Sequence, residues 1–369
     1  MIIGVDGNEA NVFQRVGVSV YTANMLEYFQ RHANPDMRFL VFLKQKPLPN
    51  LPKETEFFRY HIIPSALPLW SQTILPLKLH QMKLFRSSLD VFFSPAHYIP
   101  RFCPFPTVVT IHDLSYFYYP GEFLKKDLLQ LKQWTEYSVK RSKKIIAVSK
   151  TTQKDLYKWY RVPENKVEII YDGFEKNEAK EAAIDISQRD QKYILFVGTI
   201  QPRKNLSALI GAFHLFQKEN PEFKLIIAGK KGWLFKQIYE QVETLDLGQK
   251  VIFSGFVTDS ELVSLYRHAF CLVLPSLYEG FGIPILEAMS YDCPVLSSFT
   301  SSLPEIGGNA CLYFDPKDEK DIFDKLNRLK NDDHLKRELI KKGRSRIREF
   351  SWERCGRETL EVLKNAGYK

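Results

Sequence analysis

The chain has 369 residues, of which 44% are hydrophobic and 26% are charged, and its formal net charge is +9. A chain of this length and composition predicts an ordinary soluble protein of two domains. No apolar run approaches the roughly 18 residues that a membrane-spanning helix needs, and Asp6 interrupts the first apolar run, which argues against a signal peptide.

The first half of the chain alternates short β-rich runs with helical patterns, which favours α/β layers built on a parallel sheet. The expected strands are Ile2–Asp6, Phe39–Leu43, Phe57–Ile63, Val91–Ser94, Val108–His112, Lys144–Ser149 and Val167–Tyr171. Helices are expected at Val18–Gln30, Phe123–Arg141 and Lys150–Tyr160. The charged, Ala-rich stretch Glu175–Arg189 predicts a linker between two domains.

The second half repeats this alternation, so we expect a second doubly wound domain. Its expected strands are Tyr193–Gly198, Lys224–Gly229, Val251–Gly255, Cys271–Pro275 and Val295–Ser297. The helical patterns are Asn205–Glu219, Leu234–Leu245, Ser260–His268, Asp318–Lys330 and, at the end, Trp352–Leu363. Ligands of such sheets bind at the carboxyl ends of the strands.

Five cysteines occur without any Cys-x-x-Cys pair, and two of them lie in apolar runs. This pattern predicts buried free thiols in a reducing cytosol. Metal binding is not expected, because no cluster of His, Cys and Asp has the spacing of metal ligands.

One stretch combines basic and apolar residues. No acidic residue occurs between Glu56 and Asp90, whereas Lys78 and Lys83 stand among leucines and aromatic residues there. The pattern fits a helix on an anionic membrane surface, and it fits equally an amphipathic helix that packs on its own sheet. Nucleic acid is a weaker alternative for the positive charge, because no recognised reading module is present.

Glu279 and Glu287 stand eight residues apart in Tyr-Glu-Gly-Phe-Gly-Ile-Pro-Ile-Leu-Glu-Ala-Met, after a short buried strand. The glycines allow a tight turn, and Pro284 suits the first turn of a following helix. Such a strand–turn–helix unit directs backbone N–H groups at an anion. An isolated pair of glutamates would be read as a helix cap and a solvated face.

The whole segment, however, resembles the Glu-x7-Glu signature of retaining nucleotide-sugar glycosyltransferases of the GT-B type, glycosyltransferase family 4. The resemblance implies an α/β fold of two Rossmann-like domains with parallel sheets facing across a cleft. Residues 1–175 would form the N-terminal acceptor domain and residues 190–350 the nucleotide-sugar domain. The C-terminal helix, within residues 351–369, would cross back to the N-terminal domain.

The loop after strand Tyr193–Val197 carries Gly198 and then Arg203 and Lys204. A guanidinium beside an ammonium suits a diphosphate, whose negative charge grows as it leaves. Alone, such a pair is usually solvated. In this context it resembles the diphosphate clamp of the same family.

The resemblance also assigns roles to the remaining candidates. It implies that Glu279 contacts the donor sugar and that Glu287 holds the ribose. His112 would position the sugar, and Gly17 would approach the donor or the acceptor. The other donor-binding candidates are backbone groups: Gly198, Val257, Gly280, Phe281, Gly282 and Ile283.

We therefore expect a retaining, metal-independent hexosyltransferase that uses no cofactor. Its donor would be a nucleoside diphosphate sugar, with GDP-mannose preferred and a UDP-sugar as the alternative, and its acceptor a saccharide or lipid-linked saccharide of the cell envelope. The expected location is the cytoplasm or the cytoplasmic face of the membrane. Rival interpretations are a GT-B nucleotide-sugar epimerase, and a non-enzymatic basic protein that binds membrane or nucleic acid.

Overall fold

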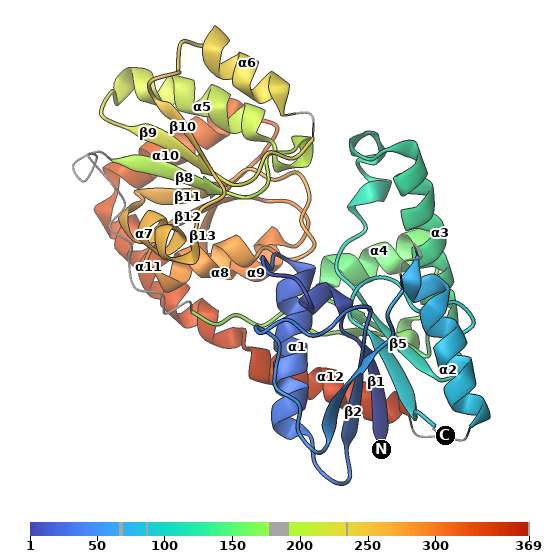
Figure 1. The fold of residues 1–369 in the computed structure, drawn as a ribbon. Coiled ribbons are helices and arrows are strands. Elements are labelled where there is room, and N and C mark those ends of the chain that lie inside the picture. Colours follow the sequence, from blue (N-terminus) through green and yellow to red (C-terminus); the bar gives the residue numbers. More distant parts are fainter. Residues whose placement is uncertain (66–68, 86–87, 177–191, 234, 368–369) are drawn as a thin grey trace. The chain divides into compact units, whose positions relative to one another are not determined.

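The computed structural model describes residues 1–65, 69–85, 88–176, 192–233 and 235–367. The chain divides into two compact units (Figure 1). Unit 1 comprises Met1–Gly173 and Phe350–Lys369, and unit 2 comprises Phe174–Glu349. Most of the linker expected at 175–189 lies outside the described residues.

Unit 1 is built on a parallel sheet in the order β3-β2-β1-β4-β5-β6-β7. The strands are β1 (Ile2–Asp6), β2 (Arg38–Leu43), β3 (Phe58–Ile62), β4 (Val91–Ser94), β5 (Thr107–Ile111), β6 (Lys144–Ala147) and β7 (Val167–Ile169). The sequence predicted all of them, with ends that differ by two residues at most. The strand order reverses between β1 and β4, which creates a switch point where this kind of sheet binds ligands.

Helices connect these strands. They are α1 (Val18–His32), α2 (Ile74–Leu84), α3 (Lys125–Arg141) and α4 (Lys150–Tyr160), with short 3-10 turns η1 (Asn8–Ala10), η2 (Trp70–Gln72), η3 (Ser115–Phe117), η4 (Pro120–Glu122) and η5 (Glu164–Lys166). The basic apolar stretch forms α2. Leu75 and Leu79 of this helix pack with Phe42 and Phe92 of the sheet, whereas Leu77 and Leu84 are exposed. The helix thus packs on its own sheet through one face and exposes apolar side chains on another.

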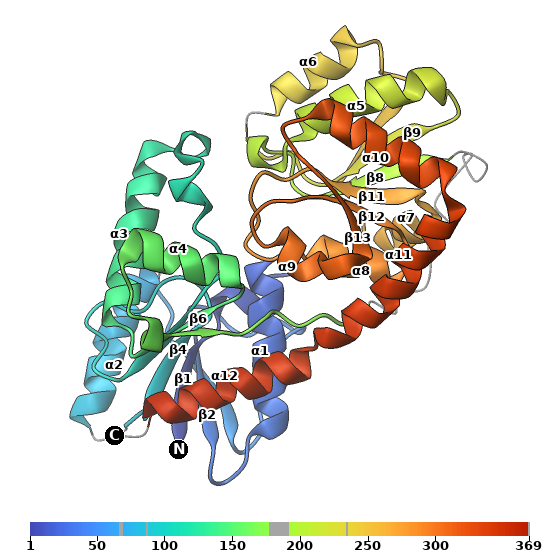
Figure 2. The ribbon, with the colours of Figure 1, turned by 180° about the vertical axis from the view of Figure 1, so that it is seen from behind.

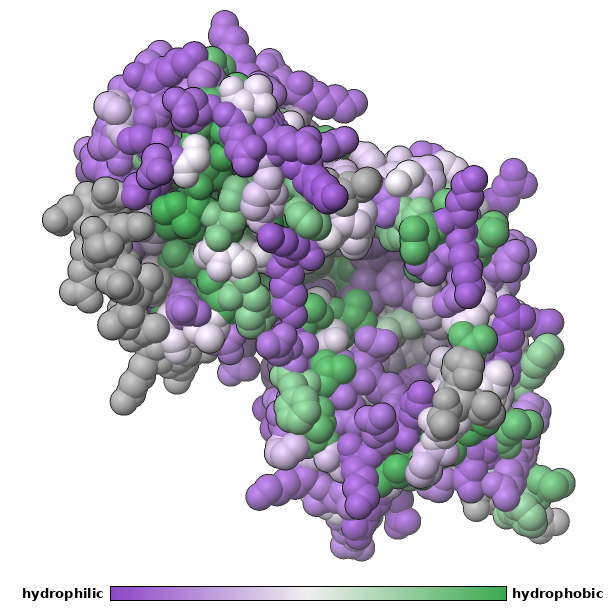
Figure 3. Space-filling model, turned by 45° about the horizontal axis from the view of Figure 1, so that its top comes forward, coloured by the Kyte–Doolittle hydropathy of each residue, from purple (hydrophilic) through white to green (hydrophobic). Residues whose placement is uncertain are grey.

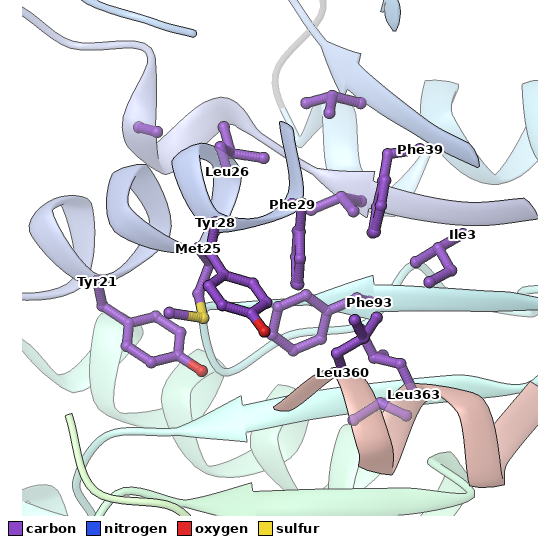
Figure 4. Packing of buried hydrophobic residues seen from close by; sticks show 14 of the residues in the cluster. Ile3, Tyr21, Met25, Leu26, Tyr28, Phe29, Phe39, Phe93, Leu360 and Leu363 are labelled. Carbon is purple, nitrogen blue, oxygen red and sulfur yellow. The ribbon is translucent and has the colours of Figure 1, made fainter. Parts of the chain in front are cut away.

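The last helix, α12 (Trp352–Gly367), belongs to unit 1 although unit 2 precedes it in the chain. It runs beside α1 and the sheet in both ribbon views (Figures 1 and 2). Leu360 and Leu363 enter the same hydrophobic core as Phe29 of α1 and Phe93 of β4 (Figure 4). The expected return of the C-terminal helix to the first domain is therefore confirmed.

Unit 2 has a second parallel sheet, in the order β10-β9-β8-β11-β12-β13. Its strands are β8 (Tyr193–Val197), β9 (Lys224–Ala228), β10 (Val251–Gly255), β11 (Cys271–Leu274), β12 (Val295–Ser298) and β13 (Cys311–Phe314). Here the order reverses between β8 and β11. The sequence prediction missed β13, a four-residue strand.

The helices of unit 2 are α5 (Leu206–Glu219), α6 (Lys236–Thr244), α7 (Asp259–His268), α8 (Ile283–Ser290), α9 (Leu303–Gly307), α10 (Glu319–Asn331) and α11 (Asp333–Arg346), with η6 (Pro202–Lys204), η7 (Gly308–Ala310) and η8 (Ile347–Glu349). Separate apolar clusters on the two faces of the sheet form the core. The sequence prediction missed α11, whose composition is dominated by charged residues.

The five cysteines are free thiols, and four of them are buried. Within the described ranges, no helix combines the length and apolarity that crossing a membrane requires. The same residues contain no group of three His, Cys, Asp or Glu side chains that could hold a metal ion.

Candidate active site

Three of the predicted residues meet at the switch point of the unit 2 sheet. Arg203 and Lys204 lie in η6, which follows β8, and Glu279 lies in the loop after β11. β8 and β11 are neighbours in the sheet, so their carboxyl ends bring these loops together. Residues about 75 positions apart in the sequence thus form one cluster.

Backbone hydrogen bonds fix the two loops against each other. The Leu277 N–H donates to the Arg203 carbonyl at 2.8 Å, and Arg203 Nη1 donates to the Tyr278 carbonyl at 3.0 Å. Asn205, in the left-handed conformation with φ 56°, donates to the carbonyls of Pro275 and Pro316 at 3.1 and 2.7 Å. Hydrogen bonds to backbone groups therefore help to position the loop that carries the two cations.

Glu279 is ion-paired with both cations. Arg203 Nη1 lies 3.4 Å from Glu279 Oε2, and Lys204 Nζ contacts Glu279 Oε1. The three side chains are only 13–16% exposed, so solvent screens their charges weakly. Burial alone would raise the pKa of Glu279, but Lys204 and Arg203 outweigh it and hold the pKa below its usual value. Glu279 therefore remains a carboxylate at neutral pH.

Serine side chains complete the surroundings of Glu279. Ser276 Oγ donates to Glu279 Oε1 at 2.7 Å, and the Glu279 N–H donates to Ser301 Oγ at 2.8 Å. Ser302 Oγ donates to the carbonyl of Phe281 at 2.6 Å. These serines were not predicted from the sequence. Ser301 and Ser302 belong to the run Ser-Ser-Phe-Thr-Ser-Ser at the end of β12, which was an available signal because β12 neighbours β11.

The turn that follows leads directly into α8. Gly282 has φ 125°, which favours glycine, and Ile283 begins the helix with Pro284 in its first turn, as the sequence predicted. Gly280 and Phe281 are buried in this turn. The candidate anion-binding segment 280–283 thus lies at the helix N-terminus, adjacent to Glu279.

Glu287 lies within α8, and its carboxylate faces α7. Tyr266 Oη donates to Glu287 Oε2 at 2.8 Å. Burial raises the pKa of Glu287, the Tyr266 hydrogen bond opposes this rise, and Asp259 adds to it. A small cavity lined in part by Glu287, Tyr266 and Asp259 lies beside them. The tyrosine partner was not predicted from the sequence.

Gly198 follows β8 and Val257 follows β10, and β9 lies between these two strands in the sheet. Gly198 has φ 153°, and a Cβ atom on Gly229 would stand 1.9 Å from the Gly198 carbonyl oxygen. This close approach of two loops requires glycine at position 229. Val257 follows β10, and its side chain is partly buried against the core.

Gly17 and His112 belong to unit 1. Gly17 precedes α1 with φ 52° and is exposed. His112 follows β5 and makes an edge-to-face contact of 4.9 Å with Tyr21 of α1. Its Nε2 lies 2.8 Å from the Pro95 carbonyl and is therefore the protonated nitrogen. Burial, with His97 nearby, lowers the pKa of His112 to about 3, so the ring is neutral.

Comparison with known protein families agrees with this geometry. Residues 16–178 match the family model described as Glycosyltransferase Family 4, and residues 177–346 match that described as Glycosyl transferases group 1. An O-antigen chain mannosyltransferase B of Escherichia coli is 31% identical over 284 residues, which cover 74% of each chain. The chain belongs to glycosyltransferase family 4. It is accordingly a hexosyltransferase, as the sequence predicted.

One further relative and one solved structure of similar fold extend the comparison. The O-antigen chain mannosyltransferase RfbU of Salmonella typhimurium is 35% identical over 214 residues, covering 58% of this chain and 57% of the relative. The crystal structure of Anabaena HepE in complex with UDP and glucose superposes with a TM-score of 0.73 at 18% identity, covering 98% of this chain and 99% of that one. The predicted GT-B fold class is confirmed.

Proposed function

We propose that this glycosyltransferase moves mannose from GDP-mannose to a hydroxyl of a saccharide or lipid-linked saccharide, with retention of anomeric configuration, in the synthesis of a cell-envelope polysaccharide. One observation carries the proposal: the buried cluster of Arg203, Lys204 and Glu279 at a sheet switch point. The O-antigen mannosyltransferases among the relatives support mannose as the sugar.

Arg203 and Lys204 would bind the diphosphate of the donor. As the glycosidic bond breaks, the leaving diphosphate gains negative charge, so fixed cations stabilise the transition state more than the ground state. The 2.8 and 3.0 Å bonds between the two loops support this role, because they preorganise the guanidinium. The backbone N–H groups of residues 280–283, at the start of α8, would add to the same anion site.

Glu279 would orient the donor sugar through its hydroxyls and stabilise positive charge on the ring carbon. Because Lys204 and Arg203 share the carboxylate, its charge is available at neutral pH. A second carboxylate at the spacing of a double-displacement glycosidase is not part of the proposed site. The acceptor would therefore attack from the face of the leaving group, and a donor phosphate oxygen would take its proton. No metal ion or cofactor takes part in this proposal.

The remaining residues would bind the rest of the donor. Glu287 would hold the ribose hydroxyls with its second carboxylate oxygen while Tyr266 occupies the first. Gly198 and Val257 would offer backbone groups to the nucleotide. In unit 1, Gly17 would allow close approach at the start of α1, and neutral His112 would position the sugar.

A thermal-shift panel with GDP-mannose, UDP-glucose and ADP-glucose tests the choice of donor, because a bound ligand raises the melting temperature by mass action. We expect GDP-mannose to give the largest shift, and Glu279→Gln to abolish mannosyl transfer without loss of fold. Full activity of that variant would refute the role of Glu279. A larger shift with UDP-glucose would favour a UDP-sugar donor, and an epimerised sugar that stays on the nucleotide would favour an epimerase.

We further propose that unit 1 contacts anionic membrane at the α2 surface, which we define as Leu77, Lys78, Lys83, Leu84 and Phe85. Leu77, Leu84 and Phe85 are 68–78% exposed. Phe102 is also 71% exposed, and its carbonyl lies 2.7 Å from His80 Nε2 of α2. Exposed apolar residues beside lysines, without acidic residues, are typical of a surface that docks on anionic lipid.

Sedimentation with vesicles tests this contact. We expect binding to vesicles of three parts phosphatidylcholine and one part phosphatidylglycerol at low salt, and release at high salt. Leu84→Ser with Phe85→Ser should weaken binding, whereas Leu215→Ser in unit 2 is the control for loss of an exposed leucine. Hydrophobic residues form separate patches among hydrophilic ones on the face shown in Figure 3, so other patches could compete. Equal binding by the double variant would exclude the α2 surface.

A further inference from the structure

Unit 1 contains a cavity of its own at the switch point of its sheet. The cavity has a volume of about 220 Å³, and its lining includes Asp6, Glu9, Lys44, Trp70, Ser94 and Tyr98. Asp6 ends β1 and Ser94 ends β4, the two strands between which the order reverses. The cavity thus lies where open α/β sheets bind ligands.

Asp6 is held in a fixed orientation at the cavity wall. Its Oδ1 accepts hydrogen bonds from the backbone N–H and from Nδ2 of Asn8, at 3.1 and 2.8 Å. Asn8 Oδ1 in turn accepts from the Lys44 N–H at 2.8 Å, which ties the end of β1 to the end of β2. Within the described part of the chain, Asp6 Oδ2 takes part in no such bond. One carboxylate oxygen is therefore preorganised to accept from a ligand.

Ser94 gives an independent indication of a ligand. Its side chain is 1% exposed, and Oγ has no hydrogen-bond partner among the described residues. A buried hydroxyl without a partner is unfavourable, so a water or a ligand is expected to bind it. Because Ser94 lines the cavity, rotation of its hydroxyl toward the cavity would give it a partner on a ligand there.

Aromatic rings supply the apolar part of the wall. Trp70 is 5% exposed, and its Nε1 donates to the Ile63 carbonyl at 2.8 Å, which fixes the ring. Tyr98 packs edge-to-face on Trp134 at 5.4 Å. A fixed aromatic wall with a few convergent polar groups is typical of small-molecule sites.

The charges of the lining favour a neutral ligand. Asp6 and Glu9 contribute two carboxyl groups, and Lys44 contributes one ammonium group. Burial raises the pKa of Asp6 to about 6, the Asn8 bonds oppose the rise, and Glu9 adds to it. Burial also raises the pKa of Glu9. A site that already disfavours its own negative charges would disfavour an anionic ligand still more.

We infer that this cavity binds one uncharged sugar ring of the acceptor, whose hydroxyls donate to Asp6 and Glu9 and meet Ser94 Oγ, and that it rejects phosphorylated or acidic sugars. The inference rests on the proposed function. The donor-binding groups proposed above are mainly in unit 2, so a sugar subsite built entirely from unit 1 suits the acceptor.

Fluorine NMR of protein labelled with 5-fluorotryptophan tests the cavity directly. The chain has five tryptophans, and Trp70→Phe assigns the resonance of Trp70. We expect methyl α-D-mannopyranoside to shift that resonance saturably, and mannose 6-phosphate to bind at least about fivefold more weakly, about 1 kcal/mol. Asp6→Asn and Ser94→Ala should each weaken binding of the neutral sugar by about five- to tenfold. Asp127→Asn, at an exposed position in unit 1, should have no effect.

Absence of any shift of the Trp70 resonance, or shifts that both cavity variants leave unaltered, would overturn the inference. Tighter binding of mannose 6-phosphate would overturn the charge selection. GDP-mannose thermal shifts of the same variants separate this result from the proposed function, because Asp6 and Ser94 take no part in the proposed donor site. Donor binding without sugar binding in the cavity would reject only the present inference. If the wild type does not bind GDP-mannose, the choice of donor is rejected, and the conclusion from the NMR experiment is unaffected.

Discussion

Glu279 serves two purposes in a space that admits little water. Its carboxylate offsets part of the positive charge of Arg203 and Lys204, and the same two cations keep it ionised. A diphosphate at these cations would share them with Glu279, so the sugar and its leaving group would be held by one connected set of charges. The ion pairs would therefore preorganise the proposed donor site, and preorganised charge is a large contribution to electrostatic catalysis.

Replacement of Arg203 by alanine should lower kcat about 100-fold or more, with a smaller change in donor KM, because the leaving diphosphate carries more negative charge in the transition state than in the bound donor. Steady-state kinetics with saturating acceptor provide the measurement. Arg203→Lys should restore part of kcat, since it keeps the charge and loses the two-pronged geometry. Arg328→Ala, an exposed arginine in unit 2, is the control. Unchanged kcat in Arg203→Ala would disprove the clamp.

Asp172 predicts a dependence of stability on pH. It is 8% exposed, Oδ1 has no partner among the described residues, and burial raises its pKa to about 8. The folded state therefore keeps a proton that the unfolded chain, with a pKa of about 3.9, releases. The free energy of unfolding should fall as pH rises from about 4 to 8, and then level off for this group.

Asp172→Asn removes this titration with little change of shape. Urea unfolding at pH 5 and pH 8 should show a smaller loss of stability with pH in the variant than in the wild type, so that the stability gain from the substitution is larger at pH 8. Tyr21 and Cys355 have pKa values raised in part by Asp172, so their titration should shift as well. An identical pH dependence in both proteins would show that Asp172 is not protonated in the fold.

At the scale of elements, the docking of α12 on α1 depends on the absence of a side chain. A Cβ atom on Gly356 would lie 2.2 Å from Tyr28 Cγ. Gly356→Ala should therefore destabilise the protein by about 1–3 kcal/mol through overpacking, although alanine favours a helix by about 1 kcal/mol. Chemical denaturation measures the effect. Gly121→Ala, where a Cβ meets nothing within 4 Å, is the control, and a stabilised Gly356→Ala would contradict the packing argument.

The α2 element shows how one pattern served two interpretations. Its basic residues among apolar ones fitted equally an amphipathic helix that packs on its own sheet and a helix that lies on an anionic membrane surface. Leu75 and Leu79 are fully buried, while Leu77 and Leu84 are 68% and 78% exposed. The packing of α2 on its own sheet is confirmed. Membrane contact through the exposed leucines stays a proposal.

At the scale of the whole molecule, the chain leaves unit 1, forms unit 2 and returns to complete the core of unit 1. Removal of residues 350–369 should expose the apolar face that Trp352, Leu360 and Leu363 cover. We expect unit 1 to lose cooperative unfolding and to bind a hydrophobic dye. Unit 2, which has its own core, should remain folded and bind GDP-mannose.

Limited proteolysis with mass spectrometry would measure this result, and the matched control is removal of the last two residues alone. Rapid digestion of both units after the larger deletion would show that unit 2 depends on unit 1. A truncated protein as stable as the full chain would show that α12 contributes little to the core.

The family resemblance implied the return of the last helix to the first domain. The amino-acid sequence alone determined the alternation of strands and helices, the seven strands of the first sheet and the positions of Arg203, Lys204 and Glu279. These features depend on local hydrophobic runs and short motifs, which can be recognised along the chain without knowledge of the fold. The tertiary structure alone decided that Ser276 and Ser301 hold Glu279, that Tyr266 binds Glu287, and that Asp6 and Ser94 border one cavity. The tertiary structure was also needed to identify β13 and α11. Ser301 and Glu279 follow the neighbouring strands β12 and β11, and Asp6 and Ser94 end the neighbouring strands β1 and β4, so the strand order brings these residues together. Tyr266 and Glu287 meet because α7 packs against α8.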